Sequence, residues 1–283
     1  MHTTFSGFLG VSATAELPVS IVIPVYNEQS VLMTNAAAIA TYLDAAFGTG
    51  NWLYILVDNG SGDNTPDILK RIVGRWPLSR VITLERPNYG AALKAGLRAA
   101  TTKWVYMLDI EQWDFPFMSW AWHNRGRYDL FVGSKRADPT LNFQAPYRRI
   151  LSAGLNFALQ VMFQYSGTDT HGPKLLNRDA LDTIIATCEL DRGQFDTELV
   201  LRATRNGYRL VELPVEYRES RPHRNWMIKK IIWNILALHR LRQVMRNVPF
   251  KDAIRYDRIS REDILLPFRQ DPSARTENAL VAS

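Results

Sequence analysis

Short apolar runs recur through the first half of the chain, and a segment with helical periodicity follows most of them. The runs are rich in β-branched and aromatic residues, which is typical of strands buried on both faces. Strands that alternate with helices of about ten to fifteen residues predict βαβ units and a mostly parallel sheet. The expected strands are Val19–Val25, Trp52–Asp58, Arg80–Leu84, Trp104–Asp109 and Asp129–Val132.

The second half has a less regular pattern. Apolar residues with a helical period and a glycine stop predict helices, and alternation predicts strands. The expected helices are Tyr147–Gln164, Phe195–Asn206 and Asn225–Arg246, and the expected strands are Thr170–Leu176 and Tyr208–Tyr217.

Composition fits a globular protein, with 46% hydrophobic and 22% charged residues. Cys188 is the only cysteine, so an internal disulfide is impossible, and we expect a small buried residue on a helix rather than a nucleophile. No secretory signal is expected in residues 1–16. No membrane span is expected either, because residues 150–168 contain many polar side chains and residues 231–238 form too short a segment.

Acidic residues follow several of the predicted strands. Because the carboxyl ends of parallel strands meet at one edge of a sheet, we expect a ligand there. Neither GxGxxG nor GxxxxGK[ST] occurs, which argues against hydride-transfer and P-loop enzymes. The candidate residues at this edge are Glu28, Asp58, Asp63, Asp109 and Glu111.

Three sequence segments that contain these acids together resemble the family 2 glycosyltransferases, which have the A-type glycosyltransferase fold. The first is VSIVIPVYNE, which begins at Val19, the second is VDNGSGDNT, with Asn59 where the family has an acid, and the third is Asp109-Ile110-Glu111, with glutamate for a second aspartate. The resemblance implies a Rossmann-like, mostly parallel α/β sheet with a C-terminal helical extension.

Further segments are similar to the dolichol- and polyprenyl-phosphate mannose or glucose synthases. They are Gly133-Ser134-Lys135, Thr168-Asp169 with Gly172 and Lys174, and Phe195-Asp196-Thr197-Glu198 followed by Glu212-x-Pro214. The resemblance covers about residues 18–221. We therefore expect a tail at 1–17, a glycosyltransferase domain at 18–220 (18–135 for the nucleotide-sugar, 136–220 for the acceptor), a basic amphipathic helical region at 221–268 and a mobile tail at 269–283.

A nucleotide-sugar donor, GDP-hexose or UDP-hexose, is implied for the first half. Asp109 and Glu111 are expected to be catalytic by holding Mg²⁺ or Mn²⁺ against the donor's phosphates, with Asp114 as a substitute for Glu111. Glu28 and Asp58 would bind the ribose or the base, and Pro24 and Tyr26 would shape the pocket wall. The alternative roles are turn formation for Asp58 and Asp63, and a helix-dipole contact for Glu28.

Basic residues in the second half are expected to bind the acceptor phosphate or the diphosphate; a solvated basic surface is the alternative. They are Lys135, Arg148, Arg149, Lys174 and Arg221. A phosphate acceptor is already an anion and attacks without a strong base, with inversion at the sugar carbon. A sugar hydroxyl would require a carboxylate base, for which Asp169, Asp196 and Glu198 are the candidates.

The C-terminal region favours the lipid-phosphate acceptor. Residues 218–251 contain nine Lys or Arg and one acid, and apolar residues recur there at helical spacing. With Trp226 and Trp233, this predicts a helix in a membrane interface, although a helix packed on the sheet has the same periodicity. The expected location is therefore cytoplasmic, at the cytoplasmic face of a membrane. A separate integral membrane partner is a further expectation, and nucleic acid is not expected as a partner.

Three functions fit the sequence. The first is transfer of a hexose to polyprenyl phosphate at a membrane surface. The second is a family 2 transferase that acts on a sugar hydroxyl of a glycan. The third is a non-catalytic protein that binds a nucleotide-sugar and has lost its metal site at Glu111.

Overall fold

The computed structural model describes residues 17–218, 227–250 and 255–270, with side chains for 17–218, 233–250 and 256–266. The expected tails at 1–17 and 269–283 therefore lie almost wholly outside the described residues. The strands are β1 (Val19–Val25), β2 (Trp52–Asp58), β3 (Arg80–Thr83), β4 (Trp104–Met107), β5 (Leu130–Ser134), β6 (Lys174–Asn177), β7 (Arg209–Pro214) and β8 (Arg255–Arg258).

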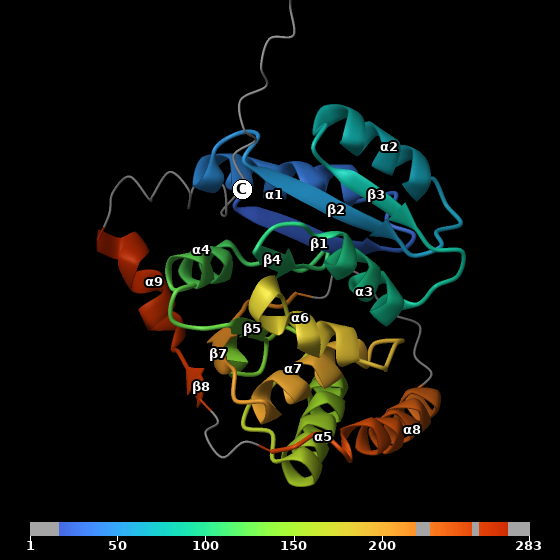
Figure 1. The fold of residues 1–283 in the computed structure, drawn as a ribbon, viewed down its shortest axis with the longest axis vertical. Coiled ribbons are helices and arrows are strands. Elements are labelled where there is room, and N and C mark those ends of the chain that lie inside the picture. Colours follow the sequence, from blue (N-terminus) through green and yellow to red (C-terminus); the bar gives the residue numbers. More distant parts are fainter. Residues whose placement is uncertain (1–16, 219–226, 251–254, 271–283) are drawn as a thin grey trace, which may run out of the picture.

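Helices connect most of these strands (Figure 1). They are α1 (Leu32–Phe47), α2 (Thr65–Arg75), α3 (Tyr89–Ala99), α4 (Phe115–His123), α5 (Pro146–Phe163), α6 (Arg178–Thr187), α7 (Phe195–Arg205), α8 (Met227–Met245) and α9 (Arg261–Gln270), with a 3₁₀ turn η1 (Pro139–Leu141).

The described strands form one sheet in the order β3-β2-β1-β4-β6-β5-β7-β8. Every neighbouring pair is parallel except the two pairs that include β6. The predicted α/β fold with a mostly parallel sheet is thus confirmed.

Helices cover both faces of the sheet. On β1, Ile21 and Ile23 pack with α1, α2, α4 and α9, whereas Val22 packs with the layer that contains α3, α5, α6, α7 and α8. Because both faces are covered, the central strands are apolar at nearly every position, which explains their continuous hydrophobic runs.

The structure differs from the prediction in several elements. Helices α4, α6 and α9 and strand β8 were not predicted, and β6 begins at Lys174 rather than Thr170. Strand β8 pairs with β7, so the C-terminal region extends the sheet beyond residue 220 as well as adding helices. No helix in the described part of the chain is long and apolar enough to cross a bilayer.

Cys188 is buried directly after α6 rather than within a helix. Burial raises the pKa of its thiol to about 12. The thiol therefore stays protonated at neutral pH, which fits the expected structural role.

Two glycines allow β5 to approach the loop that precedes β6. A Cβ atom on Gly172 would lie 1.9 Å from the carbonyl oxygen of Gly133, and one on Gly133 would lie 2.7 Å from Cγ of Pro173. The Gly133 N–H donates to the Pro173 carbonyl at 2.8 Å. Neither position has room for a side chain, so both glycines are required for the close approach of the two backbone segments.

Substitution of Gly172 by Ala should therefore destabilise the protein by about 1–3 kcal/mol, since the added methyl group meets backbone atoms. Urea unfolding measures this. Gly154→Ala on α5 is the matched control, because a Cβ there meets nothing within 4 Å. Equal unfolding midpoints for the two variants would contradict the close approach.

Candidate active site

The carboxyl ends of β1 and β2 lie side by side, with Val25 opposite Asp58. Asp58 is 2% exposed, and its Oδ1 accepts the Ser61 N–H at 3.0 Å. Tyr26, at the end of β1, is 46% exposed. The first half of the site is thus an edge at which a buried carboxylate closes the turn after β2 and an aromatic ring faces solvent.

Side chains connect the loops that follow these two strands. Asn27 has a left-handed φ of 55°, and its Oδ1 accepts the Gly62 N–H at 2.8 Å. The Glu28 N–H donates to Thr65 Oγ1 at 2.8 Å. Asp63 accepts the N–H groups of Gln29 and Thr65, so its predicted alternative role as a turn former is the one its contacts support.

Asn59, where the chain departs from the family pattern, connects β2 to α3. Its Oδ1 accepts the Asn88 N–H at 2.6 Å. The Asn88 side chain in turn accepts from Ala91 at the start of α3 and from the Arg192 N–H. The side-chain amide oxygen of Asn59 thus accepts a backbone N–H at the start of α3 and connects the end of β2 to that helix.

Asp109 and Glu111 lie on one turn just beyond β4. The Glu111 N–H donates to Asp109 Oδ1 at 2.9 Å, and the Gln112 N–H donates to the Asp109 carbonyl at 3.1 Å. Asp109 is exposed and Glu111 is half-buried. Their i and i+2 spacing thus persists as a tight turn that orients the Asp109 carboxylate.

Asp114 has a structural role instead of the substitute role considered above. Its Oδ1 accepts the Phe117 N–H at 2.8 Å and caps α4, and its Oδ2 accepts the Glu216 N–H at 3.0 Å. Nη1 of Arg261 contacts both oxygens, at 3.0 and 2.9 Å. A carboxylate held by three partners in this way is poorly suited to bind a metal.

A cavity of about 280 Å³ lies next to this turn. It brings together four of the predicted site residues, which are Asp109, Lys135, Lys174 and Asp196. Pro24, Tyr26, Glu28, Asp58 and Glu111 are not among its lining residues. The other polar residues that line it are Tyr89, Gln112, Asp114, His171, Glu216 and Tyr217.

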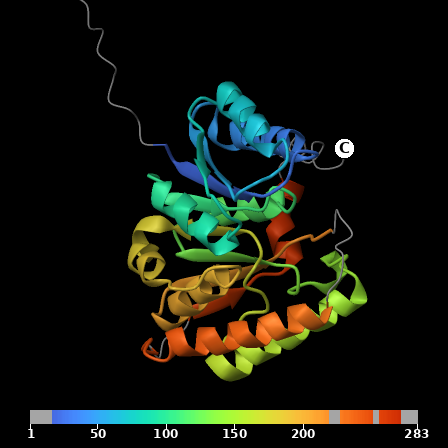
Figure 2. The same ribbon diagram turned by 90° about the vertical axis from the view of Figure 1, so that its right-hand side faces the viewer.

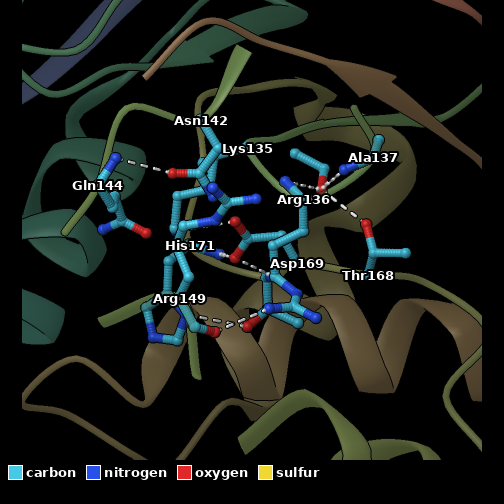
Figure 3. Close-up of polar contacts among 12 residues, drawn as sticks. Lys135, Arg136, Ala137, Asn142, Gln144, Arg149, Thr168, Asp169 and His171 are labelled. Carbon is cyan, nitrogen blue, oxygen red and sulfur yellow. Dashed lines mark hydrogen bonds and ion pairs between the residues drawn. The ribbon is translucent and has the colours of Figure 1, made fainter. Parts of the chain in front are cut away.

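On the far side of the cavity, Lys135 pairs with Asp169 at 2.8 Å (Figure 3). Asp169 Oδ1 also accepts the N–H groups of Thr170 and His171, at 2.8 and 3.0 Å. Burial acts to raise the pKa of Asp169, but Lys135 and His171 outweigh it and lower that pKa to about 2. Asp169 is therefore a weak base that holds Lys135 in place.

A second pair lies deeper in the wall. Lys174 is 1% exposed, and its Nζ donates to Asp196 at 2.8 Å and to the Gly172 carbonyl at 2.9 Å. Asp196 is the second residue of α7 and is itself 1% exposed. An unpaired buried charge is costly, so each partner requires the other. The pair therefore connects the start of β6 to the start of α7.

Two uncharged groups, neither of which was predicted, complete the wall. His171 Nε2 lies 3.0 Å from the Gly193 carbonyl, which only accepts, so we assign the ring proton to Nε2. Burial lowers the pKa of His171. Burial, together with the carboxylates of Asp196 and Asp109, raises the pKa of Tyr89 well above its usual value. Both rings are thus neutral at neutral pH.

Glu212 belongs to the Glu212-x-Pro214 segment, for which the sequence indicated no role. It is fully buried on β7 and accepts both the N–H and the hydroxyl of Thr168, at 2.6 and 2.5 Å. The hydroxyl of Tyr256 on β8 also donates to Glu212, at 3.0 Å. The unpredicted strand β8 therefore helps to fix the loop that carries Asp169.

The remaining candidates lie elsewhere. Arg148 and Arg149 are in the first turn of α5 and line neither this cavity nor the smaller one beside Arg136. Arg221 lies outside the described residues. Glu198 is fully buried and accepts from Arg202 and from the N–H groups of Glu189 and Leu190, so it stabilises α7 and does not reach the cavity.

Solved structures have the same fold. Glucosyl-3-phosphoglycerate synthase of Mycobacterium tuberculosis, in complex with Mn²⁺, UDP-glucose and phosphoglyceric acid, matches with a TM-score of 0.54 and 19% identity. The match covers 80% of this chain and 79% of that one. At this level of identity the likeness is one of fold.

Sequence relatives are glycosyltransferases. A dolichyl-phosphate beta-glucosyltransferase of Trichomonas vaginalis is 27% identical over 222 residues, which are 72% of this chain and 67% of that protein. A glycosyltransferase of Mycobacterium bovis whose function is uncharacterized is 29% identical over 204 residues, 70% of this chain and 84% of that protein. The chain spans about two thirds of the length of the dolichyl-phosphate relatives.

The profile described as glycosyl transferase family 2 matches residues 20–184, which are more than half of the chain. The matched region runs from β1 to α6 and includes Asp58, Asp109 and Lys135. The chain therefore belongs to glycosyl transferase family 2, and it is a hexosyltransferase that uses a nucleotide-sugar donor.

Proposed function

We propose that the protein transfers a hexose from a nucleotide-sugar to the phosphate of a polyprenyl phosphate. The observation that carries this proposal is the state of the carboxylates around the cavity. Each carboxylate that lines it in the described part of the chain already has a cation or N–H partner: Asp109 with the Glu111 N–H, Asp114 with Arg261, Asp196 with Lys174, and Glu216 with Arg218.

This arrangement suits an acceptor that needs no general base. Asp169 has a pKa of about 2 and is therefore too weak a base to take a proton from a sugar hydroxyl at neutral pH. A phosphate monoester is already anionic. Lys135 lines the cavity and is 13% exposed, so it can attract such an acceptor while Asp169 fixes its position.

A divalent cation fits the donor side. Among the described residues no group of three or more His, Cys, Asp or Glu side chains is placed to hold a metal, so the chain offers the two carboxylates of Asp109 and Glu111. Mg²⁺ is commonly bound by one or two carboxylates together with substrate phosphates and water. When bound, the ion would neutralise charge on the departing diphosphate.

In the proposed reaction an oxygen of the acceptor phosphate attacks the anomeric carbon. The bond from that carbon to the diphosphate breaks, and the nucleoside diphosphate leaves with the electron pair. Attack from the opposite side inverts the configuration. Lys135 would hold the acceptor, while neutral Tyr89 and His171 add no charge to the wall between the two substrates.

Transfer to a short polyprenyl phosphate should be detectable with UDP- or GDP-hexose and Mg²⁺ or Mn²⁺, because the acceptor side offers a lysine and the described carboxylates that line the cavity are already paired. The assay is product detection by mass spectrometry over a panel of donors. The parallel acceptors are an oligosaccharide and 3-phosphoglycerate. Product on either of these alone, with none on the lipid phosphate, would overturn the proposal.

Asp109→Ala should lower kcat by about 10²–10³-fold or more, since it removes the charge that would hold the cation against the donor. Asp67→Ala is the matched control, because Asp67 is an exposed carboxylate on α2 whose partner is Lys70. Steady-state kinetics across a series of Mn²⁺ concentrations measures both variants. Equal activity in the two would remove Asp109 from the site.

The pH dependence should follow the acceptor rather than an enzyme carboxylate. Asp169, with its pKa near 2, stays ionised throughout the neutral range. The rate should fall below about pH 6, where the dianion of the acceptor phosphate takes up a proton and becomes a monoanion. Replacing the phosphate with a phosphonate, whose second pKa is higher, should move this limb upward. A limb that stays fixed would point to a titrating group on the enzyme.

A further inference from the structure

A second cavity lies away from the transfer site, between the C-terminal ends of α5, α7 and α8. Its volume is about 600 Å³, and none of its lining residues is shared with the cavity beside Asp109. No acidic residue lines it. The lining residues are Met162, Phe163, Arg205, His239, Arg242, Gln243, Met245 and Arg246. We refer to it as the basic groove.

Arg205 forms the floor of the basic groove. Its Nη1 donates to the carbonyl oxygens of Met245 and Val248, at 2.8 and 3.4 Å, and its guanidinium lies 6.0 Å from the Phe163 ring. Its Nε is buried and has no hydrogen-bond partner among the described residues. Among the described residues no carboxylate pairs with this guanidinium, so an anion in the groove would serve as its counter-ion.

An exposed apolar stripe on α5 leads to the groove. Ile150, Phe157 and Val161 are 71%, 67% and 65% exposed, at a spacing that places them on one side of the helix, and Met162 at the groove is 40% exposed. Helix α8 runs beside α5, with Ile235 and Leu236 also more than half exposed (Figure 2). Apolar surface of this extent marks an interaction site.

We infer that the basic groove binds the phosphate of an anionic membrane lipid and that the α5 stripe enters the boundary of its acyl chains. Arginine pairs well with phosphate oxygens, and apolar surface beside basic surface is the pattern of proteins that bind at a membrane interface. Charge favours this occupant over a second copy of the chain, because a symmetric contact would bring Arg242 and Arg246 near their equivalents. The inference does not rest on the acceptor proposed above.

Flotation of the full chain with vesicles of equal parts phosphatidylcholine and phosphatidylglycerol tests the site. The wild type should float with these vesicles and remain below with phosphatidylcholine alone. Arg242→Gln with Arg246→Gln should weaken binding about fivefold for each arginine, which corresponds to about 1 kcal/mol each. The matched control is Arg71→Gln with Arg80→Gln, two exposed arginines on the opposite end of the sheet, which should bind as wild type.

The apolar stripe is tested by Phe157→Gln with Val161→Gln, which should also reduce flotation. Leu78→Gln with Val81→Gln changes exposed apolar residues away from α5 and should not. Transfer to a water-soluble short-chain acceptor should be unchanged in all four variants, since none of these residues lines the transfer cavity. Loss of flotation with activity intact thus separates this inference from the proposed function.

Three results would overturn the inference. The first is equal flotation of the groove variant and its control. The second is binding of inorganic phosphate, measured by calorimetry, without any binding to the anionic vesicles, which would assign the groove to a free anion. The third is a wild-type dimer, detected by light scattering, that becomes a monomer in the Phe157→Gln, Val161→Gln variant while the wild type fails to bind the vesicles. That result would assign the stripe to contact with a second copy of the chain.

Discussion

Burial of two lysines beside one cavity is the constraint on which the packing around that cavity depends. Lys135 and Lys174 are 13% and 1% exposed, and a buried ammonium group is tolerated only when an opposite charge and hydrogen bonds surround it. Their partners, Asp169 and Asp196, come from a loop and from the start of α7. Four segments must therefore meet at one place: the end of β5, the start of β6, the loop between α5 and β6, and the start of α7.

The backbone around these pairs is correspondingly tight. In the loop that carries Asp169, the Thr168 N–H donates to Glu212. The Tyr165 hydroxyl donates to the Asp169 carbonyl at 2.6 Å. Tyr165 also contacts Tyr256 at 2.9 Å, so the last strand of the sheet reaches this loop through two phenols. The loop that carries Asp169 is thus fixed by its own Tyr165 and by hydrogen bonds from β7 and β8, which favours one fixed position for Lys135.

The donor half was more predictable from sequence than the acceptor half, for a physical reason. Strands buried on both faces require continuous apolar runs, and parallel strands place their terminal acids at one edge, so Asp58 and Asp109 follow from local pattern. The roles of Asp169, Glu198 and Asp114 depend on partners far away in sequence, such as Lys135 and Arg261, and no local pattern reports them. Helix α4 escaped prediction because it is apolar on nearly every side, and β8 because its four residues RYDR carry three charges.

Helix α5 lies between the loop that carries Asp169 and the basic groove. Its first turn contacts the loop that follows β5, where Arg136 Nη1 donates to the Arg149 carbonyl at 3.4 Å. Its inner face contacts a different loop, the one between α5 and β6, because Asn156 and Gln160 both donate to the Gly167 carbonyl at 3.3 Å. Its outer face is the apolar stripe that ends at the basic groove. The hydrogen bonds from α5 therefore anchor the loop that carries Thr168 and Asp169, and Asp169 pairs with Lys135, so one helix contributes both the apolar stripe and part of the support for the Lys135 pair.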